Sequence, residues 1–170
     1  CLFCLGSFSL VLFLLCLISQ RIHADLLHHR QQSVSELACT PDELLDNKKA
    51  GKHTIMLGIE NGQAFDHSLD NIDHFAKRGI VYTTLCHNGD NDICDSARGT
   101  QTWGGVSPFG REVIARMNKL GIMVDLSHAA ESSFYDALEL STKPIVCSHS
   151  SCRALCDHPR NLTDDQMRCL

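Results

Sequence analysis

The chain has 170 residues, a net charge of −5 and an aromatic content of only 6%. This length is enough for one hydrophobic core and short for two domains. The lysines and arginines are scattered rather than clustered, and the few aromatic residues leave no surface on which bases could stack. We therefore expect no nucleic-acid partner.

The first part of the chain is strongly apolar. Residues 1–18 contain no charged side chain, and Arg21 is the first charged residue. A run of this length meets the lower limit for a membrane span, and it also fits an export signal that has lost its basic start. A third alternative is a segment foreign to the domain. We favour an export signal or membrane anchor for residues 1–20, and so expect an exported or membrane-associated protein.

Residues 21–39 are polar, and we expect them to be helical or irregular. Residues 40–170 are predicted to form one domain. Because the chain begins at Cys1 and stops at Leu170, inside a predicted helix, we interpret it as a fragment truncated at both ends. Its ten cysteines include no paired CxxC motifs with zinc spacing, so free thiols are favoured, although an exported location would leave disulfides open.

Helices and short apolar strands alternate after residue 40. Thr40-Pro-Asp-Glu43 has the pattern of a capping box with proline at the first helical position, and Gly51 ends the predicted helix. Four strands are predicted, at 54–59, 80–85, 122–126 and 145–147. Further helices are predicted after Ser68 and Ser107, over 130–141 and from Thr163, with a long polar loop at 87–105.

This alternation predicts an α/β fold with a parallel sheet covered by helices. A doubly wound sheet and a (β/α)8 barrel share the pattern. Polar, chemically active residues follow every strand, and this favours the barrel, whose active sites lie on the carboxyl-terminal face of the strands. We therefore predict a partial (β/α)8 barrel of the TIM type, with about four of its eight strand–helix units present.

Three strand ends carry residues that can bind a metal ion. Glu60 follows the strand at 54–59, and His128 and His149 each follow an apolar strand. Each residue alone is more often a hydrogen-bonded structural group, but together they indicate a hydrolytic metal site. Neutral imidazole suits zinc, and a mixed set of histidine and carboxylate allows two metal ions.

Other polar residues near these strand ends leave alternatives open. Asp125 could support a metal ligand or could face the helix layer. His87 could touch substrate, bind metal or be an ordinary loop histidine. Arg160 could grip a substrate carboxylate with two hydrogen bonds, although most loop arginines face solvent. The acidic loop 90–95 lacks the EF-hand pattern, so we interpret it as solvated; its acidic residues are Asp90, Asp92 and Asp95.

Several ordered motifs resemble the membrane dipeptidase (renal dipeptidase) family of zinc peptidases. The similarity runs from about Thr40 to the end of the chain, and the run 91–95 looks more like bacterial members than the animal enzyme. The motifs are Gly58-Ile-Glu-Asn-Gly62, Tyr82-Thr-Thr-Leu-Cys-His87, Ser107-Pro-Phe-Gly110, Asp125-Leu-Ser-His128, Ser148-His-Ser-Ser151 and His158-Pro-Arg-Asn161.

The resemblance implies a (β/α)8 barrel with two zinc ions that hydrolyses dipeptides, tolerates a D-residue at the carboxyl-terminal side and, in some members, opens β-lactam rings. In that family Glu60 matches the bridging carboxylate, and His128 and His149 match the ligands of the second metal. His87 matches the histidine beside the scissile carbonyl, and Arg160 matches the arginine that holds the terminal carboxylate. A homodimer is also compatible with the resemblance.

Two departures from the family pattern matter. His23-Ala-Asp25 has the spelling of the family's remaining metal ligands, but it lies only 37 residues before Glu60, which is too close, so we interpret it as coincidence. The family's late catalytic aspartate would lie beyond Leu170, so we expect the fragment alone to be inactive or nearly so. The alternatives are another binuclear metal-dependent amidohydrolase and a non-catalytic binding protein derived from the barrel.

Overall fold

Parallel strands and helices alternate through residues 35–170, the part of the chain that the computed structural model describes. Residues 1–18 and His23-Ala-Asp25 lie outside this part, and within it no helix is long and apolar enough to cross a bilayer. The elements are β1 (Ser35–Leu37), α2 (Pro41–Lys49), β2 (His53–Ile55), β3 (Leu57–Glu60), η1 (Gly62–Phe65), α3 (Leu69–Ala76), β4 (Ile80–Thr84), α4 (Pro108–Leu120), β5 (Met123–Asp125), α5 (Glu131–Leu140), β6 (Ile145–Val146) and α6 (Asp164–Cys169).

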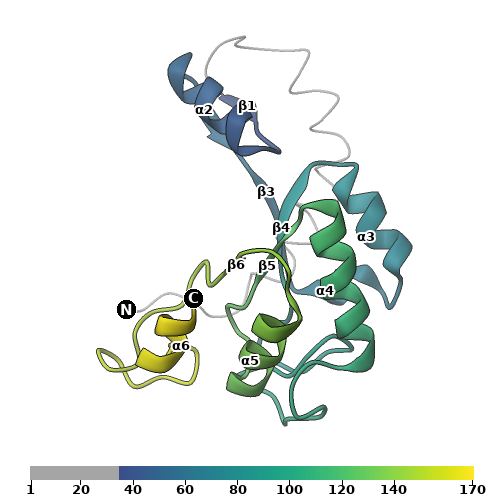
Figure 1. The fold of residues 1–170 in the computed structure, drawn as a ribbon, viewed down its shortest axis with the longest axis vertical. Helices are drawn as coiled ribbons and strands as arrows, with labels where there is room; N and C mark the ends of the chain where they lie inside the picture. The colour runs from purple at the N-terminus through teal and green to yellow at the C-terminus, as the bar shows by residue number, and fades with distance from the viewer. Residues whose placement is uncertain (1–34) are drawn as a thin grey trace. The chain divides into compact units, whose positions relative to one another are not determined.

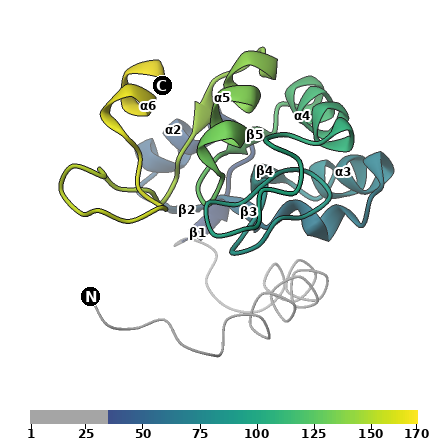
Figure 2. The same cartoon turned by 90° about the horizontal axis from the view of Figure 1, so that it is seen from below.

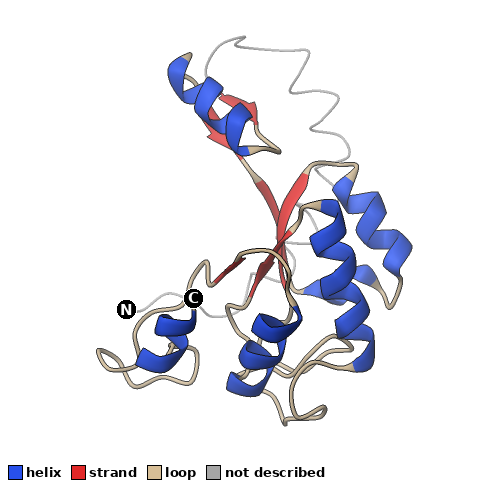
Figure 3. Ribbon diagram, in the orientation of Figure 1, coloured by secondary structure: helices blue, strands red, loops and turns tan. Residues whose placement is uncertain are grey.

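Four of the strands form one parallel sheet in the order β3-β4-β5-β6, which is also their order in the chain. Each connection between neighbours carries a helix, and helices α3, α4 and α5 lie on one side of the sheet (Figures 1 and 3). Figure 2, turned by 90°, shows α3, α4, α5 and α6 following one another in chain order. This arrangement confirms the predicted α/β fold with parallel strands.

The hydrophobic core lies between this sheet and its helices. The helices bury one apolar face each, because their apolar side chains recur at helical spacing. Fully buried are Ile72 of α3, Phe134 of α5 and three apolar residues of α4. The α4 residues are Val113, Ile114 and Met117. Burial of these faces fixes how each helix packs against the strands, and thereby the positions of the loops at the strand ends.

The first strands differ from the sequence prediction. The predicted single strand at 54–59 is two strands, β2 and β3, and only β3 joins the four-stranded sheet. β2 pairs instead with β1, in a segment predicted to be helical or irregular. Both predictions are wrong. β1 is a short exposed Ser-Glu-Leu sequence, and it becomes a strand only by pairing with β2, which lies beyond helix α2 in the chain.

The predicted helix ends are confirmed. Thr40 and Glu43 form the capping box of α2, and Thr163 and Gln166 form that of α6. At α4 the Ser107 hydroxyl accepts a hydrogen bond from the Gly110 N–H. A Cβ atom at Gly110 would lie 2.1 Å from the Ile93 carbonyl oxygen, so glycine lets the loop pack directly against the first turn of α4.

Candidate metal centre

The register of the sheet brings the strand ends level with one another. Glu60 pairs with Thr84, Thr84 with Asp125, and Asp125 with Val146. His87, His128 and His149 each stand three residues beyond one of the last three positions. Because parallel strands in register end at one edge, these three imidazoles must emerge beside the Glu60 carboxylate.

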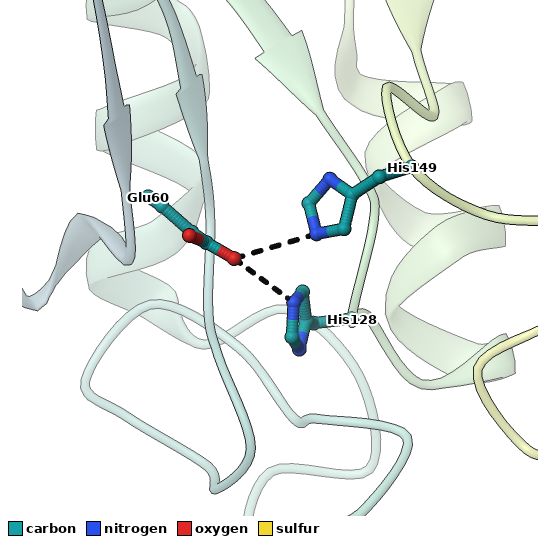
Figure 4. A group of neighbouring side chains, drawn as sticks. All are labelled: Glu60, His128 and His149. Atoms are coloured by element: carbon teal, nitrogen blue, oxygen red, sulfur yellow. Dashed lines mark hydrogen bonds and ion pairs between the residues drawn. The ribbon is translucent and has the colours of Figure 1, made fainter. Parts of the chain in front are cut away.

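The side chains meet at a single carboxylate oxygen. The Nε2 atoms lie at 3.2 Å for His128, 3.4 Å for His149 and 3.7 Å for His87 from the Glu60 Oε1. Figure 4 shows the Glu60 carboxylate pointing between the rings of His128 and His149. The sequence predicted that Glu60, His128 and His149 converge, and the structure brings them together, with His87 alongside.

The four side chains differ in their contact with solvent. His128 is 4% exposed, whereas His87, His149 and Glu60 are 43%, 42% and 35% exposed. Burial, together with the positive charge of Arg160, lowers the pKa of His128 to about 3. His128 is therefore neutral at physiological pH and keeps a nitrogen lone pair, while the other three side chains are in contact with solvent.

A metal ion fits this arrangement. One carboxylate oxygen has about two lone-pair sites, so it cannot accept hydrogen bonds from three imidazoles at once. Glu60, His128 and His149 each offer a ligand atom, and these atoms lie within 4.8 Å of one another. Two imidazoles and a carboxylate form a donor set that suits zinc and similar divalent ions. These three residues can thus hold a metal ion.

Asp125 connects the ends of three strands. Its buried carboxylate accepts hydrogen bonds from the Thr84 hydroxyl at 2.7 Å and from the Ser127 and Ser148 N–H groups, both at 3.0 Å. The Ser148 hydroxyl donates a further bond at 2.6 Å. Burial alone would raise the pKa of Asp125, but these bonds outweigh it and hold the pKa below its usual value. Of the two predicted alternatives, Asp125 supports the site.

The ionised state of Asp125 determines which nitrogen of His149 carries the proton. A carboxylate can only accept, so the Ser148 hydroxyl must donate its one hydrogen to Asp125. The same hydroxyl lies 2.8 Å from His149 Nδ1, and it can then only accept from that nitrogen. In the neutral imidazole the one proton therefore sits on Nδ1, and the Nε2 lone pair is directed toward Glu60, as metal binding requires.

Arg160 lies in the loop between β6 and α6 and approaches the same site. Its Nη2 donates to the His149 carbonyl oxygen at 3.4 Å, while its buried Nε has no hydrogen-bond partner within residues 35–170. Burial lowers the pKa of the guanidinium, and no carboxylate of the described residues forms an ion pair with it. A half-buried cation with unused donors suits an anionic ligand.

The acidic loop is not simply solvated, so that prediction is wrong. Asp90 accepts hydrogen bonds from the backbone and side chains of Thr100 and Thr102 and from the Ser96 N–H. Asp95 is fully buried and accepts from the N–H groups of Trp103 and Gly105. The alternation of Asp, Ser, Thr and Gly was the available signal, because such residues form local side-chain-to-backbone bonds.

The chain is similar to known dipeptidases over part of their length. It is 42% identical over 111 residues to an uncharacterized dipeptidase of Schizosaccharomyces pombe, a match that covers 65% of this chain and 27% of that protein. The crystal structure of the probable dipeptidase PvdM from Pseudomonas aeruginosa matches with a TM-score of 0.81 and 30% identity, over 89% of this chain and 38% of that one.

A third match contains a bound ligand. A metallo peptidase from Rhodobacter sphaeroides, liganded with a phosphinate mimic of the dipeptide L-Ala-D-Ala, matches with a TM-score of 0.75 and 26% identity, over 81% of this chain and 41% of that one. The chain thus spans well under half of the length of each of these relatives. The model of the membrane dipeptidase family (peptidase family M19) matches residues 19–170. The chain therefore belongs to the membrane dipeptidase family, and its fold is part of a TIM-type barrel.

Proposed function

We propose that the full-length protein is a zinc-dependent dipeptidase and that this chain supplies part of its active site. The observation that carries the proposal is the meeting of three imidazole Nε2 atoms at Glu60 Oε1, in a chain of the membrane dipeptidase family. Bound zinc would polarise the peptide carbonyl and activate water for attack. The phosphinate mimic of L-Ala-D-Ala in the Rhodobacter relative indicates the substrate class to test first.

The residues of this chain take separate roles in the proposal. Glu60, His128 and His149 hold metal, and Glu60 can bridge two ions because its second oxygen accepts no hydrogen bond from residues 35–170. His87 is farther from Glu60 and half exposed, so its Nε2 is available to a substrate carbonyl oxygen. Arg160 binds the substrate carboxylate, which limits the enzyme to short peptides.

Metal removal tests this proposal directly. We expect full-length protein to contain zinc, to release amino acids from L-Ala-D-Ala, to lose that activity on dialysis against a chelator and to regain it when zinc is added. Zinc content by mass spectrometry and amino-acid release by chromatography are the measurements. Dipeptide hydrolysis that persists without metal would contradict the proposal, and hydrolysis of a cyclic amide in place of the dipeptide would favour another amidohydrolase.

Substitution of Arg160 tests the substrate carboxylate. We expect Arg160→Gln to lower kcat/KM for a dipeptide by about 10- to 100-fold, because charge-assisted hydrogen bonds contribute about 1.5–3 kcal/mol. The same variant should hydrolyse the corresponding dipeptide amide, which lacks the carboxylate, as the wild type does. Steady-state kinetics with both substrates give the comparison.

A surface arginine provides the control for this substitution. Arg168 on α6 is exposed, and among residues 35–170 it pairs only with Asp165 of its own helix, so Arg168→Gln should leave hydrolysis of both substrates unaffected. An Arg160→Gln variant that loses the same factor on the dipeptide and on its amide would show that Arg160 does not bind the carboxylate.

A further inference from the structure

Two of the site histidines are linked through one buried serine of the β4–α4 loop. The Ser96 hydroxyl lies 2.5 Å from the His87 carbonyl oxygen and 3.2 Å from the His128 carbonyl oxygen, and its single hydrogen is shared between them. Ser96 is fully buried. No other side chain within residues 35–170 hydrogen-bonds to the backbone of both histidines.

His128 depends on its backbone for orientation. A metal-binding histidine usually donates its second ring N–H to a partner that fixes the ring, but His128 Nδ1 is buried and has no partner within the described residues. The His128 backbone has a φ of +73°, a conformation that is costly for a residue other than glycine. Its carbonyl oxygen is held by the Ala97 N–H at 2.7 Å and by Ser96.

Ser96 is itself held rigidly. Its N–H donates to Asp90 Oδ1 at 2.8 Å, and the Asp95 carbonyl oxygen accepts from the Ala130 N–H at 3.0 Å. The segment around Ser96 therefore pairs with the chain just after β5 while it also touches the chain just after β4. Gly99 allows this packing, because a Cβ atom there would lie 1.6 Å from Asp90 Oδ1.

We infer that Ser96 is a positioning residue that sets the separation and orientation of the His87 and His128 imidazoles. The ring centroids lie 4.4 Å apart, and the two residues follow different strands, so the strands alone do not fix the loops that carry them. The effect on metal binding rests on the proposed function; the effect on the two rings does not. Ser96 touches neither substrate nor metal, and it acts through the backbone of residues that do.

The experiment compares two buried serines in the full-length protein. Ser133 is also fully buried, and its hydroxyl donates to the Asp95 carbonyl oxygen at 2.9 Å without touching either histidine. Ser96→Ala and Ser133→Ala each remove one buried hydroxyl from the same region. We expect imidazole NMR signals of His87 and His128 in metal-free protein to shift and broaden in Ser96→Ala and to stay in place in Ser133→Ala.

Zinc affinity is the second measurement. Ser96→Ala should weaken zinc binding by about 10- to 100-fold, the usual effect of removing a group that orients a ligand, while Ser133→Ala should bind as the wild type does. If Ser96→Ala does not fold, Ser96→Cys replaces it, because a thiol has similar size but donates weakly. Unchanged histidine signals in the folded Ser96 variant would overturn the inference. A wild type that binds no zinc would instead refute the proposed function, and the histidine signals would still decide the role of Ser96.

Discussion

Replacement of Glu60 by glutamine is expected to abolish metal binding and to lower dipeptide hydrolysis by at least about 1000-fold. Without the metal, the enzyme loses several kcal/mol of transition-state stabilisation. Glutamine has nearly the same shape as glutamate, so the strand end keeps its geometry. The neutral amide cannot offset the charge of a divalent cation. It can also no longer bridge two cations through equivalent oxygens.

The fold should survive this change. Glu60 is 35% exposed and stands at the end of β3, and within the described residues its carboxylate has polar contacts only with the three histidines. Circular dichroism should therefore be unchanged, while zinc content falls. Glu112→Gln is the matched control, because Glu112 is an exposed residue of α4 and should retain zinc and activity. Wild-type zinc content in Glu60→Gln would exclude Glu60 as a ligand.

The main features of this site could be predicted from local sequence. A short apolar run followed closely by a glutamate or a histidine indicates both a strand and a polar group at its carboxyl end. Because parallel strands share one polarity, Glu60, His128 and His149 had to emerge at the same edge of the sheet. His87 and Arg160 lie in loops, and their specific roles were predicted mainly from the resemblance to the dipeptidase family.

The remaining features depend on contacts between distant parts of the chain. β1 is exposed and carries no burial pattern, so only its partner β2 makes it a strand. The fold of the acidic loop follows from hydrogen bonds to Asp90 and Asp95, and no periodicity reports such bonds. The role of Ser96 depends on two carbonyl oxygens that are nine and 32 positions away.

Substitution of Asp125 separates its effect on stability from its effect on His149. Asp125→Ala leaves the buried donors of Thr84 and Ser127, and the exposed donors of Ser148, without their acceptor, so the free energy of unfolding should fall by about 3 kcal/mol or more. Asp125→Asn retains an acceptor for the two N–H groups, and the two hydroxyls can rotate to accept from its amide. We therefore expect Asp125→Asn to fold, with a smaller loss of stability.

The dependence of stability on pH follows from the lowered pKa of Asp125. A carboxyl group whose pKa is lower in the folded state stabilises the fold above its unfolded pKa of about 3.9. That contribution is lost as the pH falls through the lower folded value. The stability difference between wild type and Asp125→Asn should thus be constant from neutral pH down to the ordinary aspartate range and should shrink only below it. Denaturant unfolding at several pH values measures this.

The metal site of Asp125→Asn should fail for a different reason. The asparagine amide donates to the Ser148 hydroxyl, which then turns its hydrogen toward His149 Nδ1. The proton of His149 moves to Nε2, where the metal-binding lone pair is needed, so zinc affinity should fall by about 10- to 100-fold. Imidazole ¹⁵N shifts report which nitrogen is protonated. Asp136→Asn is the control, because the Asp136 carboxylate accepts from the Val106 N–H and, in the described part of the chain, from no other group. A folded Asp125→Asn protein whose His149 keeps its proton on Nδ1 would contradict the proposed link between Asp125 and the protonation of His149.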